Sequence, residues 1–138
     1  MSMNESSRDT KRILVIDDDP AFRKSTRMIL EQEGYEVYSA SDAMEGLKTL
    51  PVADPALIIL DVVMADSQDG YRFAWTIRDD ERFKKYRDVP IVMTTVAYGD
   101  TLYQFESHPF TEFVPIQDLA PKPLSPDDLL ERVARLLN

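Results

Sequence analysis

The sequence lacks several residue types and patterns, and each absence excludes a class of protein or site. None of its 138 residues is cysteine, which excludes disulfide bonds, thiolate metal ligands and a cysteine nucleophile. The single histidine, His108, cannot form a histidine cluster of the kind that binds zinc, and we assign it no catalytic role. The longest unbroken apolar run, residues 56–60, is too short to span a membrane, and residues 1–10 lack the apolar core of a secretion signal. We therefore expect a cytoplasmic protein without membrane contacts.

Positive charge is also scarce. The chain has 16 lysine and arginine residues against 25 aspartate and glutamate residues, and its formal net charge is −9. Direct binding of nucleic acid by this chain is not expected, because such binding needs a basic face that displaces counterions from the phosphates. The acidic balance is compatible with a cation site or a basic partner.

Apolar runs rich in β-branched residues alternate with helical patterns about five times along the chain. The strands are expected at residues 11–16, 35–39, 56–60 and 90–95, and within 113–120. This alternation predicts an α/β fold, a flavodoxin-like doubly wound five-stranded parallel sheet in the order 2-1-3-4-5 with helices on both faces. Residues 1–10 are expected to be a disordered lead-in, and residues 11–138 to form one domain.

Helix boundaries follow from capping residues, prolines and glycines. The first helix is expected to start at Pro20 with Asp19 as its N-cap and to stop before Gly34. The second is expected to start after Ser41 and to close at Pro51. A third helix over residues 71–83 follows a turn at 69–70, and the last helix follows a cap at Ser125. A fourth helix near 99–107 is irregular, since two prolines interrupt residues 99–120.

Polar side chains stand where the predicted strands end. They are Asp17, Asp18 and Asp19 after the first strand, Asp61 after the third, Thr94 and Thr95 in the fourth, and Lys122 between two prolines after the last. Ligands bind at the carboxyl edge of an open parallel sheet, so these groups are expected to converge there.

Crowded carboxylates repel one another, and that repulsion either raises a pKa or attracts a cation. Hard oxygen ligands without cysteine favour Mg²⁺. A lysine and a threonine at the same place suggest a phosphoryl group as a second guest, with Asp61 as its acceptor.

Four motifs in this order, ILVIDDDP, LIILDVVM…DG, PIVMTT and PKP, resemble the receiver domain of two-component response regulators. The resemblance extends over residues 11–138. It implies that a sensor histidine kinase or phosphotransfer protein presents a phosphohistidine, and that the receiver catalyses transfer to its own aspartate with Mg²⁺. Such a domain is a self-phosphorylating acceptor with slow autodephosphorylation rather than a turnover enzyme, and it relays the signal by a conformational change.

The resemblance also implies a role for each matching residue. Asp61 is the phosphoacceptor, Thr95 the switch hydroxyl and Lys122 the partner of the phosphoryl group, followed by Pro123, often after a cis peptide bond. Thr94 remains an alternative to Thr95, one residue away. The implied metal ligands are Asp18 directly, Asp17 through water, Asp61, and the backbone carbonyl of Val63. Asp19 is assigned to helix capping.

The chain departs from the family pattern at three places. Ala65 stands where the family usually has proline, Leu119 stands at the aromatic switch position, and Thr95 and Lys122 are further apart than usual, with two prolines in the stretch 99–120 between them. The output face, a possible homodimer and the downstream partner therefore stay open. Two alternative functions are a non-phosphorylated receiver-like binding module with a divergent output face, and a Mg²⁺-dependent phosphohydrolase with an aspartate nucleophile on the first strand.

Overall fold

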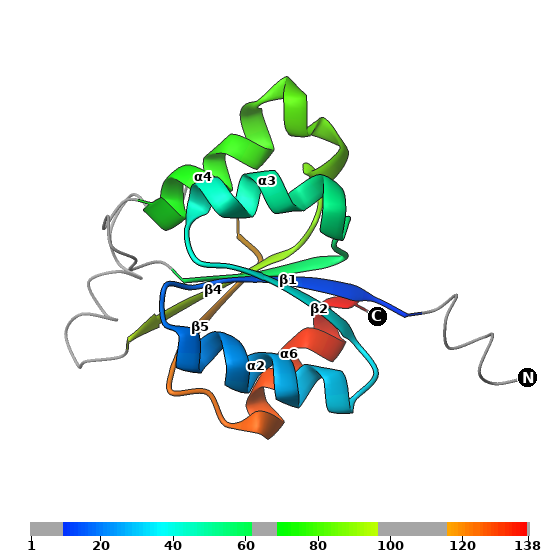
Figure 1. Ribbon diagram of the computed structural model, residues 1–138, viewed down its shortest axis with the longest axis vertical. Coiled ribbons are helices and arrows are strands. Elements are labelled where there is room, and N and C mark those ends of the chain that lie inside the picture. Colours follow the sequence, from blue (N-terminus) through cyan, green and yellow to red (C-terminus); the bar gives the residue numbers. More distant parts are fainter. Residues whose placement is uncertain (1–9, 62–68, 97–115, 138) are drawn as a thin grey trace, which may run out of the picture.

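A computed structural model describes residues 10–61, 69–96 and 116–137, and these residues form a five-stranded parallel sheet (Figure 1). The strands are β1 (Arg12–Ile16), β2 (Glu36–Ala40), β3 (Leu57–Asp61), β4 (Ile91–Val96) and β5 (Asp118–Lys122). Their order in the sheet is β2-β1-β3-β4-β5, and every neighbouring pair is parallel. The predicted fold class and strand order are confirmed.

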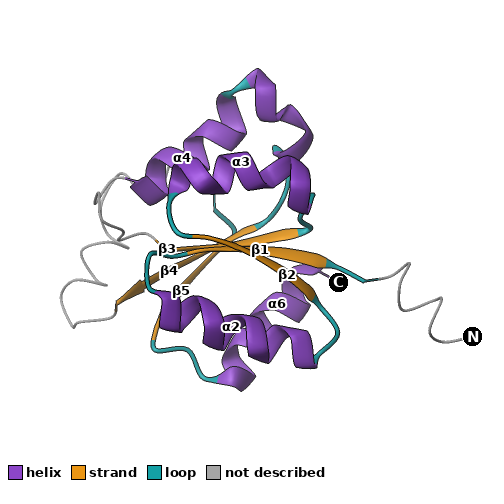
Figure 2. Ribbon diagram, in the orientation of Figure 1, coloured by secondary structure: helices purple, strands orange, loops and turns teal. Residues whose placement is uncertain are grey.

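Helices cover both faces of the sheet (Figures 1 and 2). They are α2 (Pro20–Gln32), α3 (Ala43–Ala53), α4 (Asp69–Asp79) and α6 (Pro126–Leu137), with a 3-10 helix η1 (Glu81–Tyr86) after α4. Helices α2 and α6 lie on one face, and α3 and α4 lie on the other. Within the described ranges, no helix is long and apolar enough to cross a membrane. The irregular fourth helix expected near 99–107 lies outside the described residues.

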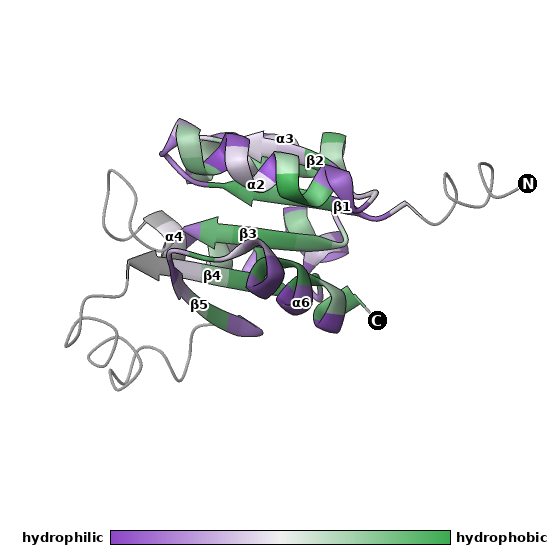
Figure 3. Ribbon diagram, turned by 90° about the horizontal axis from the view of Figure 1, so that it is seen from below, coloured by the Kyte–Doolittle hydropathy of each residue, from purple (hydrophilic) through white to green (hydrophobic). Residues whose placement is uncertain are grey.

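Two hydrophobic clusters, one on each face, hold the layers together. In β1, Ile13 and Val15 belong to the cluster under α2 and α6, whereas Leu14 and Ile16 belong to the cluster under α3 and α4. All four side chains are fully buried. Because both faces are covered, β1 and β3 are apolar along their length instead of alternating with polar residues (Figure 3). Within these two strands, Arg12 begins β1 at the amino end, and Asp61 ends β3 at the carboxyl edge, where the chemistry was expected.

The cap of α2 is as predicted, while two predictions about α3 are wrong. The Asp19 side chain accepts a hydrogen bond from the backbone N–H of Ala21 at 3.0 Å, and Pro20 opens α2. In α3 the N-cap is Asp42 rather than Ser41, because the Asp42 carboxylate reaches the N–H of Glu45 at 2.8 Å. Pro51 lies inside α3, which continues to the fully buried Ala53, since packing of that last turn against the core outweighs the hydrogen bond that proline lacks.

Two further boundaries differ from the sequence prediction. Residues 69–70 form the first turn of α4 instead of a loop, and Asp80 then caps η1, so the predicted helix over 71–83 is split in two. Strand β5 runs to Lys122 and includes Pro121, which had been placed after the strand. Proline is tolerated there because β5 is an edge strand that pairs only with β4.

Gly46 marks a close approach of α3 to the sheet and gives a test of this packing. A Cβ atom at this position would lie 2.6 Å from Cδ1 of Ile16 and 3.1 Å from Cε2 of Phe73. We expect Gly46→Val to lower the free energy of unfolding by about 1–3 kcal/mol, because extra carbon atoms in a packed core force the neighbours to shift. Urea denaturation measures the change.

Met44→Val is the matched control, since Met44 is 65% exposed on the same helix. Its unfolding free energy should change by about 0.5 kcal/mol or less. Equal stability of the two variants would contradict the close packing of α3 against β1.

Candidate functional site

Three aspartates meet at the carboxyl edge of the sheet, where β1 and β3 end side by side. The last residue of β1, Ile16, pairs with Leu60, so Asp17 and Asp61 come next on neighbouring strands. One carboxylate oxygen from each of Asp17, Asp18 and Asp61 lies within 4.8 Å of the other two. Asp17 and Asp61 are buried and Asp18 is exposed. The structure therefore brings together the three carboxylates that the sequence placed at this edge.

Asp17 is held from several sides. Its Oδ1 accepts a hydrogen bond from the backbone N–H of Asp19 at 2.9 Å, and its Oδ2 accepts one from the Lys122 ammonium at 2.6 Å. Its own N–H donates to the carbonyl oxygen of Ala40 at 3.1 Å, which ties the loop after β1 to β2. Both carboxylate oxygens of Asp17 are thus engaged with protein groups.

Lys122 reaches the site from the far edge of the sheet. It is the last residue of β5, and its Nζ lies 2.6 Å from Oδ2 of Asp17 and 3.7 Å from Oδ1 of Asp61. Its side chain is 16% exposed. The same Nζ lies 4.3 Å from the centre of the Phe22 ring. The peptide bond from Lys122 to Pro123 is cis, as the resemblance implied.

The donor set fits Mg²⁺. The three carboxylates carry more negative charge than the single ammonium of Lys122 neutralises, and two of the three are buried, where screening by water is weak. Their oxygens are hard ligands at a spacing that one small cation can bridge. A divalent cation at this place would relieve the repulsion among the carboxylates.

The other predicted site residues have different outcomes. Thr95 lies in β4 and pairs with Pro121 of β5, and Pro121 is the residue that precedes Lys122. The alternative, Thr94, is fully buried, and its hydroxyl lies 3.5 Å from the carbonyl oxygen of Leu60, a backbone contact inside the sheet. Val63, the implied backbone ligand, lies outside the described residues.

Leu119 occupies the position where the family pattern has an aromatic switch residue. It lies in β5 opposite Met93, is half-buried, and packs against the hydrophobic cluster under α3 and α4. An aliphatic side chain therefore fills the place of the expected ring.

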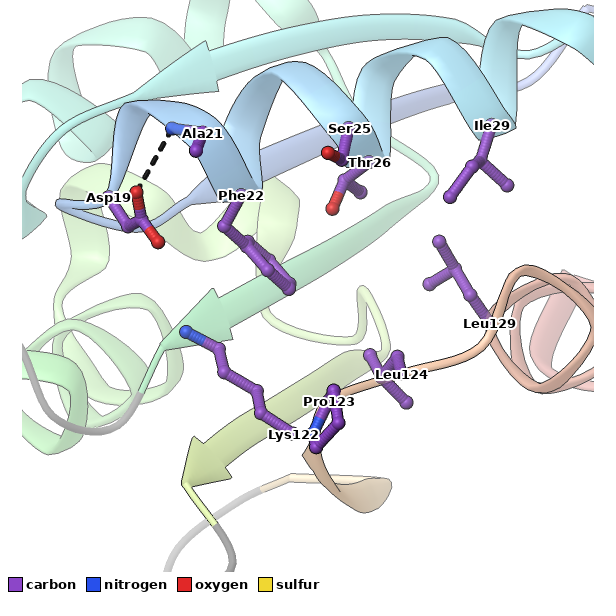
Figure 4. Close-up of a pocket in the computed structure, with 10 residues that line it drawn as sticks. All are labelled: Asp19, Ala21, Phe22, Ser25, Thr26, Ile29, Lys122, Pro123, Leu124 and Leu129. Atoms are coloured by element: carbon purple, nitrogen blue, oxygen red, sulfur yellow. Dashed lines mark hydrogen bonds between the residues drawn. The ribbon is translucent and has the colours of Figure 1, made fainter.

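Sequence reasoning missed two residues of α2 that contact the site. Phe22 is the third residue of α2, and its ring faces Lys122 (Figure 4). Arg23 donates a hydrogen bond from its guanidinium to the carbonyl oxygen of Asp17 at 2.6 Å. Both residues lie in the first helical turn after the acidic loop, and that position was the available signal, because side chains there lean back over the preceding residues.

A pocket of about 460 Å³ adjoins the site between α2 and the connection from β5 to α6 (Figure 4). Its walls are mostly apolar, with Asp19 and Lys122 at the end nearest the site and Ser25 and Thr26 further along α2. The lining residues are Asp19, Ala21, Phe22, Ser25, Thr26, Ile29, Lys122, Pro123, Leu124 and Leu129. Phe22 and Lys122 therefore belong both to this pocket and to the surroundings of the acidic cluster.

Comparison with known proteins gives relatives over nearly the whole chain. The sequence pattern of the response regulator receiver domain matches residues 13–134. The chain is 36% identical over 129 residues to the DNA-binding dual master transcriptional regulator RpaA of Synechocystis, covering 91% of this chain and 48% of RpaA. It is 34% identical over 134 residues to the CAI-1 autoinducer sensor kinase/phosphatase CqsS of Vibrio cholerae, covering 94% of this chain and 18% of CqsS. The chain thus spans about half the length of these curated relatives, or less.

Solved structures share the fold of this chain and match nearly its whole length. The chemotaxis response regulator CheY4 of Vibrio cholerae superposes with a TM-score of 0.78 at 28% identity, covering 93% of this chain and 99% of that one. The response regulator TrrA of Thermotoga maritima, in complex with Mg²⁺–BeF, gives a TM-score of 0.74 at 33% identity, covering 93% of this chain and 100% of that one. With the acidic cluster at the edge of the sheet, these matches show that the chain belongs to the response regulator receiver domain family.

Proposed function

We propose that this chain is a phosphorylation-controlled receiver whose phosphoacceptor is Asp61. The observation that carries the proposal is that Lys122 lies beside two buried carboxylates, those of Asp17 and Asp61, at the edge of the sheet. The donor is a phosphohistidine of a sensor histidine kinase or phosphotransfer protein, as in two-component signalling. The relative TrrA, solved with Mg²⁺–BeF, supports the metal and phosphoryl parts of this assignment.

Mg²⁺ would be held by Asp18 and Asp61, by Asp17 through water, and by the carbonyl of Val63. When bound, it supplies positive charge between the acceptor carboxylate and the phosphoryl oxygens, and so reduces their mutual repulsion. The exposure of Asp18 and the engagement of both Asp17 oxygens support the division between a direct and a water-mediated ligand.

The proposed transfer is a displacement at phosphorus. A carboxylate oxygen of Asp61 attacks the phosphorus atom, an O–P bond forms and the P–N bond to histidine breaks. The electron pair of that bond stays on the imidazole nitrogen, which takes up a proton. The Lys122 ammonium, 3.7 Å from Asp61, neutralises part of the charge that arrives, and the Thr95 hydroxyl donates a hydrogen bond to the phosphoryl group. Slow attack of water later returns the Asp61 carboxylate and inorganic phosphate.

The geometry weighs against a phosphohydrolase with its nucleophile on the first strand. The Asp19 carboxylate caps α2, and both oxygens of Asp17 accept hydrogen bonds from Asp19 and Lys122. Both oxygens of the Asp17 carboxylate are therefore engaged, and one oxygen of the Asp19 carboxylate is held by the helix cap. The non-phosphorylated binding module stays a second prediction, and its signature would be partner binding that is indifferent to Asp61→Asn.

The remaining parts of the proposal concern the bounds of the domain, its location in the cell and its partners. We propose a domain over residues 11–138, a cytoplasmic location, a histidine kinase or phosphotransfer protein as the upstream partner, and a possible homodimer. RpaA is described as DNA-binding, and this chain covers only 48% of it. Direct nucleic-acid binding by this chain is not proposed, because its net charge is −9.

Phosphoryl transfer gives the first functional test. With acetyl phosphate and Mg²⁺, the wild-type chain should gain the mass of one phosphoryl group, and Asp61→Asn should gain none, because the amide cannot act as the nucleophile. Intact-mass spectrometry measures the gain. Asp79→Asn, an exposed position in α4, is the control and should be labelled like the wild type. Labelling of Asp61→Asn at the wild-type level would refute Asp61 as the acceptor.

Metal binding gives the second test. We expect Asp18→Asn to weaken Mg²⁺ binding by about tenfold or more, since even outer partners of a metal contribute about 10–100-fold to affinity. Isothermal titration calorimetry measures the dissociation constant.

The matched control is Asp19→Asn, which removes the neighbouring negative charge and keeps a good N-cap for α2. Its affinity for Mg²⁺ should stay much closer to that of the wild type. The ligand assignment is wrong if both variants lose affinity equally.

A further inference from the structure

The Phe22 ring and the Asp17 carboxylate approach the Lys122 ammonium from the same short segment of chain. Nζ lies 4.3 Å from the ring centre and 2.6 Å from Oδ2 of Asp17. Four residues separate Asp17 from Phe22, and they include part of the loop between β1 and α2. This short segment therefore presents both a negative charge and an aromatic face to a lysine that comes from β5.

The position of Phe22 is fixed by the start of α2. Asp19 caps the helix, Pro20 occupies its first position and Phe22 its third. The N–H of Asp19 also donates to Oδ1 of Asp17, so the cap and the buried carboxylate are held together. The ring itself packs against the hydrophobic cluster under α2 and α6.

The position of a lysine ammonium depends on contacts from its surroundings more than the positions of most side chains do. Its four-carbon stem has several rotatable bonds, and its ammonium is a compact, strongly hydrated charge. Asp17 alone fixes a distance and leaves the direction of approach open. A ring on another side of the ammonium excludes water there and attracts the charge through its quadrupole.

We propose that Phe22 is a positioning residue for phosphoryl transfer, which holds the Lys122 ammonium beside Asp61 through a cation–π contact. This inference rests on the proposed function, because Lys122 there stabilises the phosphoryl group. The contact also survives changes in charge on the carboxylates, so the ring keeps the ammonium in place when the phosphoryl group reaches Asp61.

Three variants separate the ring from ordinary packing. Phe22→Leu keeps an apolar side chain in the cluster and removes the ring, whereas Phe22→Tyr keeps both. Ile29→Val removes apolar volume from the same face of α2 and the same pocket, away from the lysine. All three are made in the full chain and compared with the wild type.

The first readout is the rate of Asp61 phosphorylation by acetyl phosphate at saturating Mg²⁺. In this reaction an Asp61 oxygen bonds to phosphorus, and the P–O bond to the acetyl group breaks with release of acetate. We expect Phe22→Leu to lower the rate about fivefold, while Phe22→Tyr and Ile29→Val stay within about twofold of the wild type. The Mg²⁺ dissociation constant should be the same in all four proteins, since Phe22 carries no metal ligand.

The second readout is the NMR shift of the Lys122 side-chain protons, assigned by their loss in Lys122→Met. A ring at this distance shifts the protons next to the ammonium upfield, so the shift should be present in the wild type and Phe22→Tyr and absent in Phe22→Leu. A normal lysine shift in the wild type, or an unchanged rate in Phe22→Leu, overturns the proposal.

Failure of the proposed function looks different from failure of this inference. If the wild type accepts no phosphoryl group at all, the receiver function is wrong and so is the role of the ring in transfer. The NMR shift then still decides whether the ring holds the ammonium.

Discussion

The contact between Lys122 and Asp17 is the constraint on which the rest of the site depends. Strands β1 and β5 are not neighbours, because β3 and β4 lie between them in the sheet. The lysine nevertheless reaches across the carboxyl edge and places its ammonium 2.6 Å from Asp17 and 3.7 Å from Asp61. A buried charge is tolerated only when it is paired, so this contact fixes how three strands end relative to one another.

The same contact leaves the site short of positive charge. One ammonium faces three carboxylates, and two of these are buried. The repulsion that remains works against the folded state, and a cation that binds only the folded chain offsets it. Among the described side chains, the carboxylates of the acidic cluster thus outnumber the ammonium group that contacts them. An acidic loop can therefore follow the apolar strands β1 and β3, since the sheet brings the carboxylates together at a spacing that one cation could bridge.

The part of this arrangement that depends on local chemistry could be predicted from the sequence. The apolar run of β1, the Asp19 cap and the order of the strands all follow from short-range patterns, and the carboxylate cluster follows from the order of the strands. The remaining features depend on which side chains are buried and contact one another in the folded chain. Pro51 stays helical because Ala53 is buried. Phe22 contacts Lys122, which lies 100 positions later in the chain, and sequence periodicity gives no information about contacts between residues so far apart.

Side chains of β5 pack into different hydrophobic clusters on the two faces of the sheet, and this explains why the ring near Lys122 comes from a helix. Leu119 packs into the cluster under α3 and α4, whereas Ala120 belongs to the cluster under α2 and α6. An aliphatic side chain has no hydroxyl whose hydration would compensate for leaving the core, so Leu119 has little reason to alternate between buried and exposed positions. The aromatic contact to Lys122 is made instead by Phe22, on the opposite face of the sheet. Among the described residues, the aromatic ring that contacts Lys122 therefore lies in the first turn of α2 and not in β5.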